Sequence, residues 1–306
     1  MKFELKDFKG VIPAYVTPFD KDGNYYEKSA KEVINWLIGL GVGGFYLTGS
    51  NGFGAAMDSC ERMKVVESIC DIVDGRVPVV AHIAAVSGQL SAKMARHAES
   101  VGCTGVSAVP SYYYKLTPDE MYRYYSEIAS ASSLPLVIYA QTHVYEPSVE
   151  MFERLATIPN VKGLKFTGPN HYMMGRIKEK LGKDFMVYSG YDEMFLSGLI
   201  FGADALIGGT YNVIPDIYIS AVEHFEKSEI KLAQKEMFVA NAIVQCLIKN
   251  DIQAAMKVCL EVMGMDAGYT PTPFGMMDTL AKEKFLGELR EIKKSTDVTC
   301  ELFKAI

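Results

Sequence analysis

The sequence is poor in features that mark disulfide-stabilised or metal-binding proteins. It has six cysteines among 306 residues, and they form neither a CxxC pair nor a regular framework. Such usage favours reduced thiols, each packed as a small apolar side chain, over a disulfide scaffold. The five histidines show no spacing with acidic residues that is typical of a metal site. We therefore expect no metal site.

Long apolar runs and basic clusters are also missing. The first ten residues carry charges every two or three positions and lack the apolar stretch of a signal peptide. The most apolar run, 194–209, contains Asp204 and is shorter than the roughly 20 residues that a membrane span needs. A net charge of -6 without a basic cluster argues against nucleic acid and anionic membranes as partners. We expect a cytoplasmic protein whose partner is a small molecule.

Short apolar runs alternate with helical patterns along most of the chain. The runs are nearly continuous, as is typical of parallel strands covered on both faces. We expect eight strands, each followed by a helix, at 11–17, 44–47, 77–82, 105–109, 136–139, 161–165, 186–188 and 205–207. Eight such units favour an α/β fold of the closed (β/α)8 TIM-barrel type over an open doubly wound sheet. No GxGxxG follows the first strand, so the usual signal for dinucleotide binding is absent.

The strand pattern stops after about residue 227. Three helical patterns follow, at 229–249, 253–263 and about 276–303, with Gly268 to Pro271 as a turn between two of them. The sequence thus predicts a catalytic barrel, 1–227, and a C-terminal three-helix appendage, 228–306. We expect this appendage to pack on the barrel in a structural role.

The strand at 161–165 carries the first candidate for chemistry. With a period of two, Val161, Gly163 and Lys165 share one face, so Lys165 would point into a closed barrel at its carboxyl end. Barrel enzymes hold their active sites at that end. Other residues that follow expected strands would lie at the same edge: Ser50, Asn51, Tyr112, Tyr139, Thr167, Gly190, Asp192 and Glu193.

Each of these residues also has an ordinary structural interpretation. A lysine at a strand end is more often a solvated charge, and Tyr139 alone would be a core tyrosine. Asp192 and Glu193 could simply begin a helix, whose N-terminus favours carboxylates. His143 follows Tyr139 in a loop, where it either touches substrate or is exposed. The coincidence of so many polar groups on one face favours covalent chemistry by an amine.

Six short motifs occur in order along nearly the whole chain. They are TGSNG at 48–52, PSYY at 110–113, GLKFT at 163–167, SGYDE at 189–193, GGTYN at 208–212 and DAGY at 266–269. In order and spacing they resemble the dihydrodipicolinate synthase and N-acetylneuraminate lyase family of class I, Schiff-base aldolases. The pieces around Lys165 and Asp192 are most similar to the lyase branch. The synthase branch has an arginine shortly after the tyrosine that matches Tyr139, and none follows here.

The resemblance implies a reaction and a set of roles. Lys165 would form a Schiff base with a 2-keto acid, and Tyr139 would move protons, aided by Tyr112 from an adjacent subunit of a homotetramer built as a dimer of dimers. Ser50 and its loop amides would bind the substrate carboxylate. The other substrate-binding residues would be Asn51, Thr167, Gly190, Asp192, Glu193 and Gly209. The expected reaction splits N-acetylneuraminate into N-acetylmannosamine and pyruvate, and it needs no cofactor.

Several positions depart from the family pattern. Asn51 stands at the second hydroxyl position of its loop, Phe53 replaces a glutamate, and Gly209 stands where lyases often have serine; the Asn-x-Pro that usually follows Tyr139 is absent. Asparagine cannot relay a proton as a hydroxyl does, so the substrate stays open. One alternative is a Schiff-base aldolase or lyase acting on another sugar-derived 2-keto acid. The other is a non-catalytic protein that binds a sugar acid or keto acid.

Overall fold

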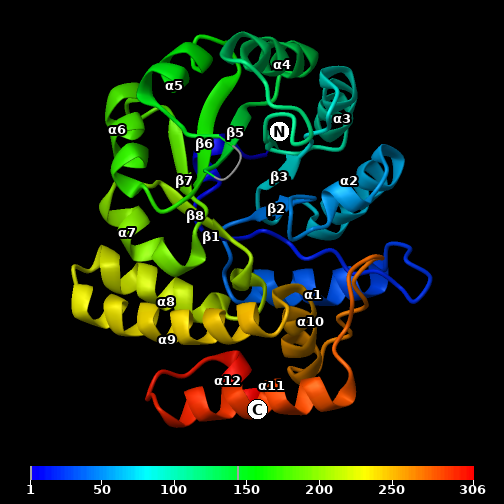
Figure 1. The fold of residues 1–306 in the computed structure, drawn as a ribbon, viewed down its shortest axis with the longest axis vertical. Helices are drawn as coiled ribbons and strands as arrows, with labels where there is room; N and C mark the ends of the chain where they lie inside the picture. The colour runs from blue at the N-terminus through cyan, green and yellow to red at the C-terminus, as the bar shows by residue number, and fades with distance from the viewer. Residues whose placement is uncertain (1, 143–144) are drawn as a thin grey trace.

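Eight parallel strands form the centre of the molecule in the computed structural model, which describes residues 2–142 and 145–306. The strands are β1 Gly10–Pro13, β2 Phe45–Leu47, β3 Val79–His82, β4 Gly105–Ala108, β5 Leu136–Gln141, β6 Val161–Thr167, β7 Met186–Ser189 and β8 Ala205–Gly208. Their order is β1-β8-β7-β6-β5-β4-β3-β2. The two ends of this order meet through a bridge between Ala14 and Tyr46, and the expected (β/α)8 barrel is confirmed (Figure 1).

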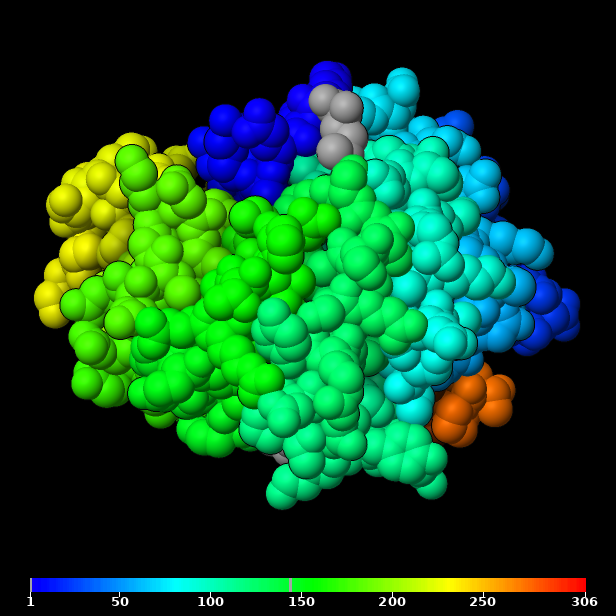
Figure 2. All heavy atoms as spheres, turned by 90° about the horizontal axis from the view of Figure 1, so that it is seen from above, coloured from blue at the N-terminus to red at the C-terminus, as the bar shows by residue number. Residues whose placement is uncertain are grey.

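A helix follows every strand and covers the outside of the barrel. These helices are α1 Glu27–Gly39, α2 Ser59–Val73, α3 Gly88–Ser100, α4 Pro118–Ala131, α5 Val149–Leu155, α6 His171–Leu181, α7 Phe195–Ile200 and α8 Pro215–Glu226. Their apolar faces pack on the outer sides of the strands in the larger of two core clusters. Figure 2 views the molecule from the end opposite its C-terminal helices, where the surface is formed mainly by cyan-to-green segments.

The smaller core cluster fills the barrel interior. Its members come from nearly all the strands and from the N-terminal segment: Leu5, Phe8, Ile12, Ala14, Tyr46, Val80, Val137, Tyr188, Ala205 and Ile207. Leu5 lies near the start of β4 and Phe8 near the start of β2, so the N-terminal segment plugs the amino end of the barrel.

β6 contains a bulge that the sequence pattern does not reveal. The pairing with β5 moves from Leu136–Val161 to Val137–Gly163, so Lys162 has no partner on that strand. Val161 therefore packs in the outer core, whereas Gly163 faces Val137 of the barrel interior. The prediction that Val161 shares a face with Gly163 and Lys165 is wrong, because the extra residue shifts the alternation by one.

Four helices form the C-terminal part: α9 Ile230–Lys249, α10 Ile252–Val262, α11 Thr279–Lys294 and α12 Glu301–Ala305. The expected boundary after residue 227 falls between α8 and α9, which pack side by side (Figure 1). The prediction of one continuous helix over about 276–303 is wrong. Between α11 and α12 the chain is rich in β-branched and polar residues with low helix propensity, from Ser295 to Thr299.

The segment around Gly268 connects α10 and α11, as expected, and also pairs with the chain after β1. Tyr269 N donates to Phe19 O at 2.7 Å, and Phe19 N donates to Tyr269 O at 3.2 Å. Gly268 has a φ of +63°, and a Cβ there would lie 2.7 Å from Phe19 O, so glycine suits this position on both counts. No helix in the described ranges has both the length and the apolar character of a membrane span.

Candidate active site

Lys165 lies inside the barrel near its carboxyl end, with only 5% of its surface exposed. Its Nζ is 4.1 Å from the ring centre of Tyr139 and 4.6 Å from that of Tyr46. Tyr139 is its register partner on β5, and the two tyrosine rings meet edge to face at 6.2 Å. The amine thus lies beside two aromatic rings and away from bulk water, in the kind of buried site where a nucleophilic lysine is expected.

Tyr139 Oη accepts a 2.7 Å hydrogen bond from Gln141 Nε2. Both residues lie on β5, two positions apart, so their side chains emerge on the same face. Gln141 was missed from the sequence because the strand was expected to end at Tyr139. The strand alternation with a period of two, which indicated Lys165, would also have placed Gln141 on the face of Tyr139.

Gly190 allows the backbone after β7 to approach Lys165 and Thr167. A Cβ at this position would overlap Thr167 Oγ1 and lie 3.1 Å from Lys165 Cε. Thr167 Oγ1 is itself buried and has no hydrogen-bond partner among the described residues. A buried hydroxyl without a partner is costly unless a ligand or water satisfies it. Lys165, Thr167 and Gly190 are thus brought together, as the sequence predicts.

Asp192 contacts the chain at the carboxyl end of β8. Its Oδ2 accepts hydrogen bonds from Thr210 N at 2.7 Å and from Thr210 Oγ1 at 2.6 Å, and its Oδ1 lies against Gly208, where a Cβ would overlap it. Burial raises the pKa of Asp192 to about 6, although the bonds from Thr210 act in the opposite direction. The neighbouring Glu193 is half-buried, and its carbonyl oxygen accepts a 3.0 Å bond from Asn241 Nδ2 of α9.

The loop that carries Ser50 and Asn51 is bracketed by two residues in the left-handed region. Thr48 has a φ of 51° and Phe53 a φ of 55°, and neither is a glycine. Thr48 Oγ1 donates to His82 O at 2.8 Å, and Thr17 Oγ1 donates to Gly52 O at 2.9 Å. Hydrogen bonds at both ends therefore hold the loop in one conformation.

Asn51 follows β2 and Gly209 follows β8, the two strands that flank β1, and their loops meet at the carboxyl end. A Cβ at Gly209 would overlap Asn51 Nδ2. Asn51 Oδ1 accepts a 3.3 Å hydrogen bond from Gln253 Nε2 of α10, so the C-terminal part also contacts this loop. Gln253 was missed from the sequence, where no local pattern relates it to a position 202 residues earlier.

A model of the dihydrodipicolinate synthetase family matches residues 7–292. The chain belongs to this family. The N-acetylneuraminate lyase of Citrobacter koseri is 33% identical over 292 residues, which cover 94% of this chain and 96% of the relative. A structure of N-acetylneuraminate lyase from Mycoplasma synoviae is 30% identical, with a TM-score of 0.86 and coverage of 94% of this chain and 98% of that one. A catalytic-lysine mutant of Ruminococcus gnavus sialic acid aldolase is 26% identical, with a TM-score of 0.89 and coverage of 95% and 99%.

Membership of the dihydrodipicolinate synthetase family makes this chain a Schiff-base aldolase, a carbon–carbon lyase of class I. The expectation of an enzyme is confirmed. The alternative of a non-catalytic binding protein is therefore set aside. The geometry of Lys165, buried beside a register-paired tyrosine, agrees with such chemistry.

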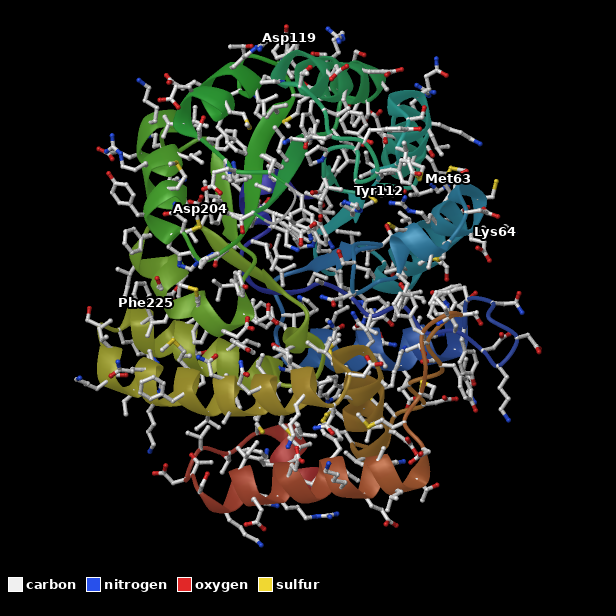
Figure 3. The ribbon with its side chains drawn as sticks, in the orientation of Figure 1. Met63, Lys64, Tyr112, Asp119, Asp204 and Phe225 are labelled. Carbon is white, nitrogen blue, oxygen red and sulfur yellow. The ribbon has the colours of Figure 1, made fainter. Side chains whose placement is uncertain are left out.

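Tyr112 is half exposed, at 49%, and adjoins the more exposed Tyr113 and Tyr114. In Figure 3 it projects between the barrel strands and helices α2 and α3. No hydrogen bond or ring contact among the described residues joins it to Lys165 or Tyr139. Its role in the site stays a prediction that depends on an adjacent subunit.

His82 is a site residue that the sequence did not single out. Its ring lies 6.0 Å from those of Tyr46 and Tyr139. Val109 N donates to its Nε2 at 3.3 Å, so the proton resides on Nδ1, which lies 3.3 Å from Thr48 O. Burial, followed by the positive charges of Arg62 and Lys165, lowers the pKa of His82 well below its usual value. His82 is therefore a neutral ring that fixes the loop beginning at Thr48.

Arg62 supports the same region from α2. Its Nη1 donates to Ala84 O at 2.7 Å and its Nη2 to His82 O at 2.6 Å.

Within the described ranges, no group of three or more His, Cys, Asp or Glu side chains is arranged to hold a metal ion, and all six cysteines are free. His143, named above as a loop candidate, lies outside the described residues.

Proposed function

We propose that this protein cleaves N-acetylneuraminate into N-acetylmannosamine and pyruvate through a Schiff base at Lys165. The observation that carries the proposal is the burial of Lys165 beside two tyrosine rings at the carboxyl end of the barrel. The hydroxyl of Thr167, which has no partner in the part of the chain that the structure describes, supports a site for a hydroxylated ligand. Relatives named N-acetylneuraminate lyase, and an aldolase with a catalytic lysine, support the choice of substrate.

The reaction proceeds through a series of intermediates that stay covalently bonded to Lys165. The neutral amine of Lys165 attacks the C2 ketone, and loss of water gives a protonated imine that withdraws electrons. Removal of the proton from the C4 hydroxyl then breaks the C3–C4 bond and releases N-acetylmannosamine. The enamine that remains takes a proton at C3, and water hydrolyses the imine to pyruvate and free Lys165.

The other residues bind the substrate and move its protons. Tyr139 transfers protons at the reacting carbons, with its oxygen held by Gln141 and with help from Tyr112 of an adjacent subunit in a homotetramer. Ser50 and the amides of its loop bind the carboxylate. The hydroxylated chain of the sugar is bound by Thr167, Gly190, Asp192 and Glu193. The remaining substrate-binding residues are Asn51 and Gly209. We place the enzyme in the cytoplasm.

Reductive trapping tests the covalent step. Incubation with pyruvate and borohydride should attach a label to Lys165, which peptide mass spectrometry would locate. The labelled enzyme should no longer form pyruvate. Lys165→Met should remove the label, whereas Lys162→Met changes an exposed lysine of the same strand and should not. A parent protein that stays unlabelled at Lys165 would refute the mechanism.

A second candidate is cleavage of another sugar-derived 2-keto acid by the same mechanism. The contact between Asn51 and Gly209, two positions that depart from the family pattern, favours it. Turnover should be compared across a panel of 2-keto sugar acids that differ in chain length and in the acetamido group. Labelling of Lys165 with poor cleavage of N-acetylneuraminate would favour this candidate over the first.

A further inference from the structure

Asn51 and Gly209 cannot be understood separately, because the side chain of one occupies the space over the other. A Cβ at Gly209 would overlap Asn51 Nδ2 and lie 3.0 Å from Asn51 Cγ. A serine at position 209 and the present Asn51 side chain therefore exclude each other. The two departures from the family pattern are therefore coupled. The Asn51 amide occupies the space in which the side chain of a serine at position 209 would lie.

The backbone of Gly209 is fixed, so it cannot withdraw from Asn51. Asn212 Nδ2 donates to Gly209 O at 2.7 Å and to Ala14 O at 2.9 Å, and Val16 N donates to Asn212 Oδ1 at 3.2 Å. Asn212 is fully buried. Any substituent at position 209 must therefore displace the Asn51 amide rather than the main chain.

Gln253 sets the orientation of the Asn51 amide. Gln253 Nε2 donates to Asn51 Oδ1 at 3.3 Å, which leaves Asn51 Nδ2 as the group that faces Gly209. Gln253 Oε1 is buried and has no hydrogen-bond partner among the described residues. Gln253 lies in the first turn of α10, so the C-terminal part supplies the residue that holds the amide in place.

The Asn51 amide contacts Gly209, which leads back along the chain toward Asp192. Gly209 directly follows Gly208, which lies against Asp192 Oδ1. Asp192 in turn is near enough to Lys165 to be influenced by its charge. The two adjacent glycines therefore connect the Asn51 amide with the part of the site that holds Asp192.

We propose that Asn51 determines specificity by donating a hydrogen bond from Nδ2 to an oxygen of the substrate's hydroxylated chain, and that Gln253 positions it. This inference rests on the proposed function, since it assigns part of the same site. An amide nitrogen only donates, whereas a serine hydroxyl also accepts. The site thus selects a 2-keto sugar acid that presents an accepting oxygen at this point. The C-terminal part has a role in substrate choice as well as in structure.

A double-mutant cycle tests the exchange between positions 51 and 209. Gly209→Ser alone should lower kcat/KM for the best sugar-acid substrate by about 10-fold, because the new side chain displaces the amide. Asn51→Thr alone should lower it by about 10-fold, because the donor is lost. The double variant should recover to within about 3-fold of the parent, since a hydroxyl then replaces the amide. Losses that multiply to about 100-fold would overturn the proposal.

Two further measurements separate this inference from the proposed function. Pyruvate lacks the hydroxylated chain, so trapping of pyruvate at Lys165 should be affected less than sugar-acid cleavage in every variant of the cycle. An equal loss in both assays would place Asn51 on the carboxylate and overturn the inference alone. Absence of trapping in the parent protein would instead refute the Schiff-base mechanism itself.

The positioning role of Gln253 has its own control. Gln253→Leu should lower kcat/KM for the sugar acid several-fold in the parent, with a rise in KM, and should have little further effect once Asn51→Thr is present. Gln234→Leu, at a glutamine of α9 in the same C-terminal part, should match the parent in both backgrounds. Equal effects of Gln253→Leu with and without Asn51 would show that it acts on stability rather than through the amide.

Discussion

Gln141 Nε2 donates a 2.7 Å hydrogen bond to Tyr139 Oη, and the two side chains emerge from the same face of β5. Because the phenol oxygen accepts this bond, its own hydrogen remains available for donation toward the ligand space. The bond also restricts rotation of the Tyr139 side chain. Gln141 therefore positions the residue that moves protons in the proposed reaction.

Loss of the Gln141 amide should lower kcat more than it changes KM. We expect Gln141→Leu to reduce kcat by about 10-fold, since Tyr139 loses the bond that orients its hydroxyl during proton transfer. Steady-state kinetics should separate the two constants, and Gln141→Asn should restore part of kcat. Gln89→Leu, at an exposed glutamine of α3, is the control. A kcat equal to that of the parent would contradict the role of Gln141.

Gly190→Ala should impair the reaction by crowding Lys165 and Thr167. The added methyl would overlap Thr167 Oγ1 and press on Lys165 Cε. We expect kcat/KM to fall by at least about 10-fold and trapping of pyruvate at Lys165 to slow, because both groups must shift from their positions. Gly287→Ala in α11 places its methyl in open space and should leave both rates unchanged. Parent-like trapping in Gly190→Ala would show that this close approach has no role in catalysis.

Lys257 should give the protein a stability that rises with pH. It is buried, its Nζ donates to Thr17 O at 3.2 Å and to Ala267 O at 2.8 Å, and burial lowers its pKa from 10.5 to about 7. Below pH 7 Lys257 is protonated in both the native and the unfolded chain, so the native state bears the full free-energy cost of burying the charge. Between these two pKa values the unfolded chain binds the proton that the native chain lacks. The free energy of unfolding then rises by up to about 1.4 kcal/mol per pH unit from this group.

Denaturant unfolding of the parent and of Lys257→Met isolates that contribution. The difference in unfolding free energy between the two proteins should move in favour of the parent as the pH is raised from 7 toward 9. Other titrating groups cancel in the difference because both proteins contain them. A constant difference over this range would contradict a buried, largely neutral lysine.

Phe53→Glu, which restores the residue usual in the family, should destabilise this chain. Phe53 is 3% exposed and packs against Phe19, with ring centres 6.0 Å apart, and against Phe274 at 5.0 Å. A carboxylate here would lose these contacts and be buried among apolar side chains, at a cost of about 3 kcal/mol or more. Phe53→Leu keeps an apolar side chain and should cost about 1 kcal/mol. Thermal or denaturant unfolding that ranks the two variants equally would contradict this explanation of the departure.

The barrel and the placement of Lys165 could be predicted because both depend on local patterns. Near-continuous apolar runs gave the strands, and the parallel register then places Tyr139 opposite Lys165. The same alternation failed at Val161, because a one-residue bulge at Lys162 leaves no trace in an apolar pattern. Gln141 was within reach of the pattern and was lost only because the expected strand ended two residues early.

Contacts between distant segments could not be predicted from the sequence. Gln253 reaches Asn51 across 202 positions, and Asn212 joins Gly209 to the segment after β1. Polar side chains of this kind carry no periodic signal, so a helix with Gln253 in its first turn appears only as an amphipathic pattern. Their partners depend on how the closed barrel brings its loops to one edge. The family motifs marked the positions, but not the contacts between them.

The strained loop between Thr48 and Phe53 has a consequence for the affinity of small ligands. A three-carbon keto acid offers few atoms with which to offset the loss of loop entropy on binding. Here both flanking residues already have left-handed backbone angles, and hydrogen bonds from Thr17 and Thr48 fix the ends. The conformational ordering occurs during folding of the barrel rather than at the arrival of the ligand. Preorganisation of this kind lets the weak contacts of a small carboxylate contribute to binding almost undiminished.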